Sequence, residues 1–127
     1  MSKFKCKDYG STFRNARKGF RIGVKSEKNI RIHIVVGSLV LVFGYMLHFS
    51  AEKFCILLLA IAMVIVSELL NTGIEFALDA VFHNKYSRLV GMAKDVSAGA
   101  VMFATLISIL IGLILFGEAI LKLVTAG

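Results

Sequence analysis

Four polar residues follow one another at helical spacing in the segment SELLNTGIEFALD, residues 67–79. They are Glu68, Asn71, Glu75 and Asp79. Steps of three, four and four positions place all four side chains on one face of an α-helix. Carboxylates in such a row can accept a proton where they are partly shielded from water, or bind Mg²⁺ through hard oxygen atoms. Packing between apolar helices usually needs only Ser, Thr or Asn, so three acids in one row favour chemistry over packing.

A second polar group lies at the start of the last apolar segment, in GMAKDVSAGA, and contains Lys94 and Asp95. The N-terminus of a helix together with a lysine makes a suitable site for a phosphate group. Asp95 could help to hold a metal ion or a nucleotide beside it. The competing interpretation of Lys94 is an ordinary interfacial lysine whose ammonium group reaches lipid headgroups.

The chain that carries these residues is strongly apolar. It has 127 residues, of which 57% are hydrophobic, and its mean hydropathy is +0.81. These values exceed those of a typical water-soluble domain. No secretory signal peptide is expected, because the first apolar run begins only after about 30 mostly polar residues and lacks a small-residue cleavage pattern. The sequence predicts an all-α membrane protein with a single domain over residues 1–127.

Three apolar segments are long enough to cross a membrane as helices. We expect transmembrane helices over residues 32–49, 53–82 and 90–124. The second exceeds a hydrocarbon core of about 30 Å, so its far end should extend into the cytosol. Small residues recur every four positions in the third, at Ala100, Ala104, Ser108 and Gly112. This pattern allows another helix to approach closely, either within the chain or in another subunit.

Residues 8–25 are expected to form an amphipathic helix on the membrane surface, with Ser11 or Thr12 as its N-cap. Residues 1–31 contain ten Lys or Arg residues against only Asp8 and Glu27. This excess predicts a cytoplasmic N-terminus beside anionic lipid headgroups, and three spans then place the C-terminus outside. No nucleic-acid partner is expected, because no recognition motif accompanies the charge.

Several other kinds of site are not supported by the sequence. Cys6 and Cys55 have no CxxC spacing and fall on opposite sides of the membrane in this topology, so we expect free thiols. His33, His48 and His83 show no metal-ligand spacing, and we assign them no chemistry. The sequence also lacks GxxxxGK[ST], GxSxG, HExxH and the protein-kinase signature. An enzyme of phosphoryl transfer would therefore need a different design.

Three motifs, EKNIRIH, SELLNTGIEFALD and GMAKDVSAGAV in this order, resemble the small bacterial integral-membrane lipid kinases, the diacylglycerol kinase and undecaprenol kinase family. RIH at 31–33 and the N-terminal ARKGF look more like the undecaprenol kinase branch. The resemblance implies a homotrimer in the bacterial inner membrane. It also implies transfer of the γ-phosphate of ATP, with Mg²⁺, to a membrane lipid alcohol, for which we expect undecaprenol, with diacylglycerol as the alternative.

The resemblance further implies roles for individual residues. Glu68 matches the general base, and Glu27 and Glu75 match the carboxylates that bind magnesium. The polar residues around the nucleotide and the reacting centre are matched by Asn71, Asp79, Lys94 and Asp95. The loop before the last span reads NKYS where the family often has PEYH, and it retains Tyr86, which we expect to contact the nucleotide.

Two functions of other kinds stay open on the sequence. In a proton-conducting or cation-conducting membrane protein the row of carboxylates would be a relay, although no acid continues it through the outer half of the membrane. In a non-catalytic adaptor the basic N-terminal helix would bind anionic lipid. Neutralising Glu68 and Glu75 in such an adaptor would change stability alone.

Overall fold

The computed structural model describes residues 8–127, which are α-helical with short connections and contain no strand. The four helices are α1 (Tyr9–Ser26), α2 (Lys28–Met46), α3 (Ala51–Phe82) and α4 (Arg88–Ala126). Helices α2, α3 and α4 are each long and apolar enough to cross a membrane. The predicted all-α architecture with three candidate spans is therefore confirmed. Cys6 and the basic residues Lys3, Lys5 and Lys7 lie outside the described residues.

Helix α1 begins one turn earlier than its predicted cap. Asp8 is the N-cap, and its Oδ1 atom accepts the backbone N–H of Ser11 at 2.7 Å. The prediction of Ser11 or Thr12 as the cap is wrong, because a carboxylate caps a helix as well as a hydroxyl does and lies ahead of both. The backbone N–H of Ser11 lowers the pKa of Asp8, since the hydrogen bond favours the ionised carboxylate.

Helices α1 and α2 meet at Glu27, a single residue with extended backbone at φ −119° and ψ 117°. Arg31 fixes this corner, because its Nη1 atom donates to the backbone carbonyls of Val24 and Lys25, each at 2.8 Å. Helix α2 thus starts at Lys28, one turn before the predicted residue 32. Hydropathy marks where apolar side chains begin, whereas the helix already includes the polar turn before them.

The turn between α2 and α3 is also placed differently from the prediction. Helix α2 ends at Met46 instead of residue 49, because His48 adopts a left-handed conformation with φ 58° and the N–H of Phe49 returns to the carbonyl of Gly44. Ser50 then caps α3 by accepting the backbone N–H of Lys53 at 3.3 Å. Helix α3 begins at Ala51, two residues before the predicted start.

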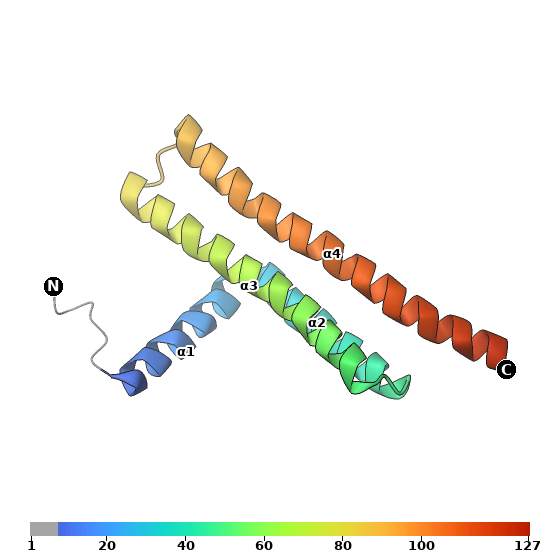
Figure 1. The fold of residues 1–127 in the computed structure, drawn as a ribbon. Coiled ribbons are helices and arrows are strands. Elements are labelled where there is room, and N and C mark those ends of the chain that lie inside the picture. The colour runs from blue at the N-terminus through green and yellow to red at the C-terminus, as the bar shows by residue number, and fades with distance from the viewer. Residues whose placement is uncertain (1–7) are drawn as a thin grey trace.

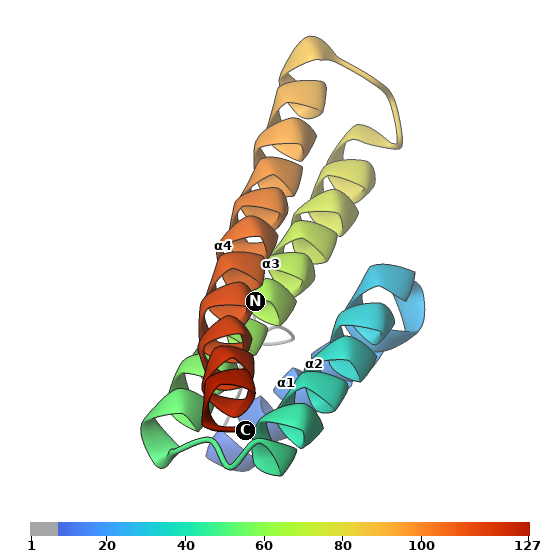
Figure 2. The same cartoon turned by 90° about the vertical axis from the view of Figure 1, so that its right-hand side faces the viewer.

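Helices α3 and α4 form a long antiparallel hairpin, and α2 lies beside α3 (Figure 1). At 1.5 Å per residue, the 39 residues of α4 extend about 58 Å, well beyond a hydrocarbon core of about 30 Å. The loop end of the hairpin projects past the start of α2, while α1 runs away from the bundle at a steep angle (Figures 1 and 2). The membrane-surface position of α1 stays a prediction.

Small residues let α4 pack closely on α3. Ala104 is buried, and the Ser108 hydroxyl donates to the backbone carbonyl of Ala60 at 2.9 Å. Ala100, the first residue of the predicted small-residue row, is exposed. Packing within one chain therefore accounts for Ala104 and Ser108. An apolar cluster closes the opposite end of the bundle and consists of Phe49, Leu57, Leu115 and Ala119.

Candidate active site

The polar residues on α3 share one face of the helix, as their spacing predicts, but they contact two different helices. Glu68 is buried and faces α2. Asn71 and Asp79 are half-buried and form hydrogen bonds with side chains of α4. One helix face thus divides its contacts between two neighbours.

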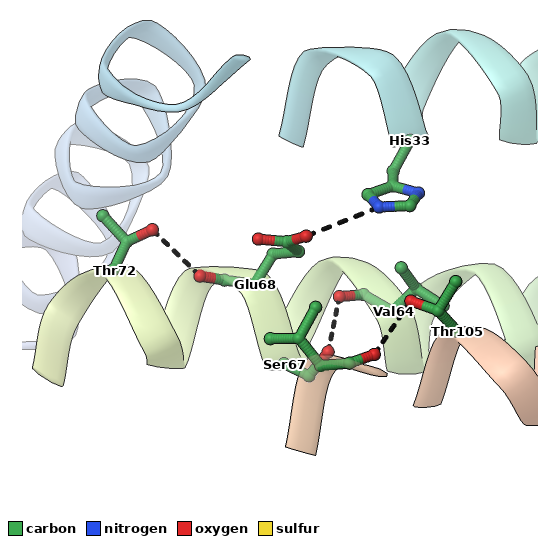
Figure 3. A network of polar contacts seen from close by, with 7 residues as sticks. His33, Val64, Ser67, Glu68, Thr72 and Thr105 are labelled. Carbon is green, nitrogen blue, oxygen red and sulfur yellow. Dashed lines mark hydrogen bonds and ion pairs between the residues drawn. The ribbon is translucent and has the colours of Figure 1, made fainter. Parts of the chain in front are cut away.

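Glu68 is paired with a histidine of α2. Its side chain is 6% exposed, and its Oε1 atom lies 3.4 Å from Nε2 of His33 (Figure 3). The Thr72 hydroxyl donates to the backbone carbonyl of Glu68 at 3.0 Å and leaves the carboxylate untouched. An ionisable group within a membrane costs about 2.5–3.5 kcal/mol at the bilayer centre, so a partner of this kind is expected.

His33 was assigned no chemistry from the sequence, so this contact was not predicted. The helical spacing along α3 says nothing about which face of α2 lies opposite, because that depends on how the two helices pack. One signal was present in the sequence. His33 is an ionisable residue near the start of the apolar segment 32–49, and such residues within a span usually face a partner.

Asn71 connects α4 to the next carboxylate of the row. Its amide oxygen accepts the hydroxyl hydrogen of buried Ser97 at 2.6 Å, and its Nδ2 atom donates to Oε1 of Glu75 at 3.5 Å. The first bond is short and the second is long for a hydrogen bond. Ser97 therefore fixes the orientation of Asn71, which in turn faces Glu75. The sequence motif contains Ser97, but its spacing alone did not indicate this role.

Asp79 forms an ion pair with Lys94 of α4, with 2.9 Å between Oδ1 and Nζ. Both side chains are more than one third exposed, at 39% and 37% respectively. Ion pairs this close to solvent contribute little to stability. The pair therefore places the ammonium group beside the acidic row but holds it weakly enough for an incoming anion to compete.

Among the described residues, the other three candidates form no hydrogen bond or ion pair with the polar residues of α3. Glu27 is at the corner between α1 and α2, Asp95 is exposed, and Tyr86 is 83% exposed in the loop before α4. A Cβ atom on Gly91 would lie 2.8 Å from the Tyr86 hydroxyl, so glycine lets the ring lie against α4. Within residues 8–127, no hydrogen bond or ion pair connects the side chains of these three residues to Glu75.

Carboxylate oxygens of the kind that Mg²⁺ binds are present at Glu27 and Glu75. Over residues 8–127 there is no group of three or more His, Cys, Asp or Glu side chains arranged for a metal ion. Magnesium commonly keeps several waters and is held by one or two carboxylates together with phosphate oxygens. Glu75 has an amide, Asn71, as its described partner and no cation in ion-pair contact. The donor set therefore fits a magnesium ion that arrives with a polyphosphate.

Comparison with known proteins shows the family of the chain. Residues 14–116 match the prokaryotic diacylglycerol kinase family. A diacylglycerol kinase of Synechocystis is 34% identical over 101 residues, which are 80% of this chain, and the chain spans 58% of that relative's length. An undecaprenol kinase of Bacillus subtilis is 34% identical over 105 residues, which are 83% of this chain and 85% of the relative. The predicted resemblance is confirmed, and the chain belongs to the prokaryotic diacylglycerol kinase family.

Proposed function

We propose that this protein is a lipid kinase that transfers the γ-phosphoryl group of ATP to the hydroxyl group of a membrane lipid alcohol. One observation carries the proposal. Glu68 is buried within an apolar helix that is long enough to cross a membrane, and the same helix continues into the half-exposed acids Glu75 and Asp79. A carboxylate shielded from water therefore lies on the same helix as two carboxylates that are partly exposed to solvent. Membership of the family and the names of both relatives support the same activity.

Glu68 is the proposed general base. The oxygen of the lipid hydroxyl attacks the γ-phosphorus while its proton passes to the Glu68 carboxylate. A bond forms between that oxygen and the γ-phosphorus, and the bond from the γ-phosphorus to the bridging oxygen breaks. ADP leaves with that electron pair. Phosphoryl transfer needs mainly alignment and charge neutralisation, so one well-placed base is sufficient on the acceptor side.

The nucleotide side of the site is proposed to use the residues around Glu75. Lys94 contacts the phosphates through its ammonium group, and Asp79 holds that group in place beforehand. Asn71 orients Glu75, which with Glu27 would bind the magnesium ion. A bound magnesium ion neutralises charge on the phosphates. Tyr86 and Asp95 lie at the exposed edge, where they are proposed to contact the nucleotide.

We infer that the lipid is undecaprenol, with diacylglycerol as the alternative substrate. The motifs ARKGF and RIH favour the undecaprenol kinase branch. Identity alone does not distinguish the two, since it is 34% to a relative of each name. We further propose a homotrimer in the bacterial inner membrane, with a cytoplasmic N-terminus close to anionic headgroups and an external C-terminus. The Lys and Arg residues near the N-terminus support this orientation.

The experiment that tests the function supplies radiolabelled ATP and Mg²⁺ to purified protein in lipid, with undecaprenol and diacylglycerol offered separately. Labelled undecaprenyl phosphate is the expected product. Glu68→Gln should lower turnover by about 10³-fold or more, as expected for a lost base and its positioning, while nucleotide affinity is kept. Glu52→Gln is the matched control, because Glu52 is exposed at the opposite end of α3.

Two results would contradict the proposal. If neither lipid is labelled by well-folded protein, the kinase function is wrong. If Glu68→Gln turns over as fast as the wild type, a different group accepts the proton. ATP-independent ion flux across liposomes would instead favour a conducting protein. The structure offers little support for such flux, because residues 96–117 of α4 contain no ionisable side chain.

A further inference from the structure

We propose that His33 is a positioning residue for Glu68, and that it holds the carboxylate in the rotation at which one oxygen accepts the proton of the lipid hydroxyl. This inference rests on the proposed kinase function. It extends the site, whose other contacts are made by α3 and α4, to a side chain of α2.

The geometry assigns the two carboxylate oxygens to different tasks. Oε1 of Glu68 lies 3.4 Å from Nε2 of His33, and the other oxygen points away from the imidazole ring (Figure 3). A hydrogen on Nε2 would engage Oε1 and leave the second oxygen for the substrate. The distance of 3.4 Å exceeds that of a good hydrogen bond, and catalytic contacts of this kind shorten when substrate is bound.

Other hydroxyl groups near Glu68 are already committed to the backbone. Ser67 donates to the carbonyl of Val64 at 2.8 Å, and Thr72 donates to the carbonyl of Glu68 itself. Thr105 on α4 donates to the carbonyl of Val101. Among residues 8–127, His33 is therefore the sole side chain in polar contact with the Glu68 carboxylate.

Burial makes a single donor important. The Glu68 side chain is 6% exposed, so water contributes little to fixing its rotation, whereas the His33 ring is 27% exposed. A buried carboxylate without a donor loses both its solvation and a defined direction. The ring is partly exposed because it also lines an apolar groove of about 340 Å³ between α2, α3 and α4. His33 therefore lies between the buried carboxylate of Glu68 and this apolar groove.

The test compares two substitutions that differ in one property, the donor. In His33→Gln the side-chain amide can place an N–H close to the position of the imidazole Nε2, whereas His33→Leu has no polar atom. We expect His33→Leu to lower kcat by about 100-fold, the loss typical of a misplaced reacting group. The KM for Mg-ATP should change by less than about threefold, because His33 has no proposed contact with the nucleotide. His33→Gln should recover kcat to within about tenfold of the wild type.

A control histidine lies at the other end of α2. His48 has φ 58° and is exposed, and asparagine tolerates that backbone conformation, so His48→Asn should leave kcat unchanged. Assembly of each variant is checked by gel filtration in detergent. If His33→Leu does not fold, His33→Asn replaces it, because its amide ends too short to reach Glu68. The same loss of kcat is then expected.

Three results would overturn the inference. Wild-type kcat in His33→Leu would show that Glu68 needs no orienting donor. A kcat in His33→Gln as low as in His33→Leu would mean that ring shape, not the donor, matters. A rise in KM for Mg-ATP with unchanged kcat would place His33 at the nucleotide. In each case wild-type transfer and the defect of Glu68→Gln would still support the kinase function, so the two failures are distinguishable.

Discussion

Replacing Lys94 by methionine separates a structural role of the Asp79 ion pair from a role in phosphate binding. In the structure, Nζ of Lys94 lies 2.9 Å from Oδ1 of Asp79, and both side chains are more than one third exposed. Methionine keeps an unbranched side chain and removes the charge. The two roles predict losses of different size in different measurements.

The Asp79–Lys94 ion pair contributes little to the folding stability of the protein. Such an exposed ion pair is weak, and salt screens it further. A charge-assisted hydrogen bond to a phosphate is worth about 1.5–3 kcal/mol, which corresponds to about a 10- to 150-fold loss of kcat/KM. We therefore expect Lys94→Met to lower kcat/KM for Mg-ATP by that factor while thermal unfolding in detergent changes little.

The assay is initial-rate kinetics with varied Mg-ATP at saturating lipid. Lys122→Met is the matched control, because Lys122 lies on the same helix and pairs with Glu118 at 3.0 Å, but near the opposite end. It removes an ion pair of the same kind and should leave kcat/KM within about twofold of the wild type. Equal losses in both variants, or a loss of stability in Lys94→Met without a loss of rate, would refute the assignment of Lys94 to phosphate.

Two further predictions concern the metal and helix packing. Glu75→Gln should weaken binding of Mg-ATP but not of ATP in EDTA, because only the metal-bound nucleotide uses the carboxylate; calorimetric titrations that agree in both conditions would remove Glu75 from the metal site. Gly37→Leu should lower thermal stability by about 1–3 kcal/mol, since its Cβ would lie 2.8 Å from Ile61. Gly112→Ala is its control, because a Cβ there meets no atom within 4 Å, and equal unfolding temperatures for both variants would contradict the packing argument.

The features that depend on local sequence were predictable. Long apolar segments indicated three candidate spans, and the three- and four-residue steps of the SELLNTGIEFALD motif placed four polar side chains on one face of a helix. Both patterns are properties of one helix. The predicted positions of helix ends were less accurate, because several nearby residues can each cap the same helix. Asp8 accepts the backbone N–H of Ser11 and so caps α1 three residues ahead of Ser11. The first turn of α2 is helical although most of its residues are polar.

The partners across helices were not predictable from spacing. His33 faces Glu68, and Ser97 faces Asn71, because of the rotation and register of α2 and α4 against α3. Those quantities are set by packing of side chains such as Ala104 and by the Ser108 hydrogen bond to Ala60. A sequence motif indicates that a polar residue needs a partner, but several faces of a neighbouring helix satisfy the same spacing.

The different exposure of the two acid–base pairs suggests how the site works. The Glu68 carboxylate is almost fully buried, so loss of the His33 contact would leave a buried polar group without a partner. We therefore expect the contact to persist through the reaction cycle. The Asp79 carboxylate is 39% exposed, so water can replace Lys94 at little cost when a phosphate attracts the ammonium group. We infer that the proton-accepting end is formed before substrates arrive. The nucleotide end, where the Asp79–Lys94 pair is open to solvent, would then be completed by the nucleotide itself.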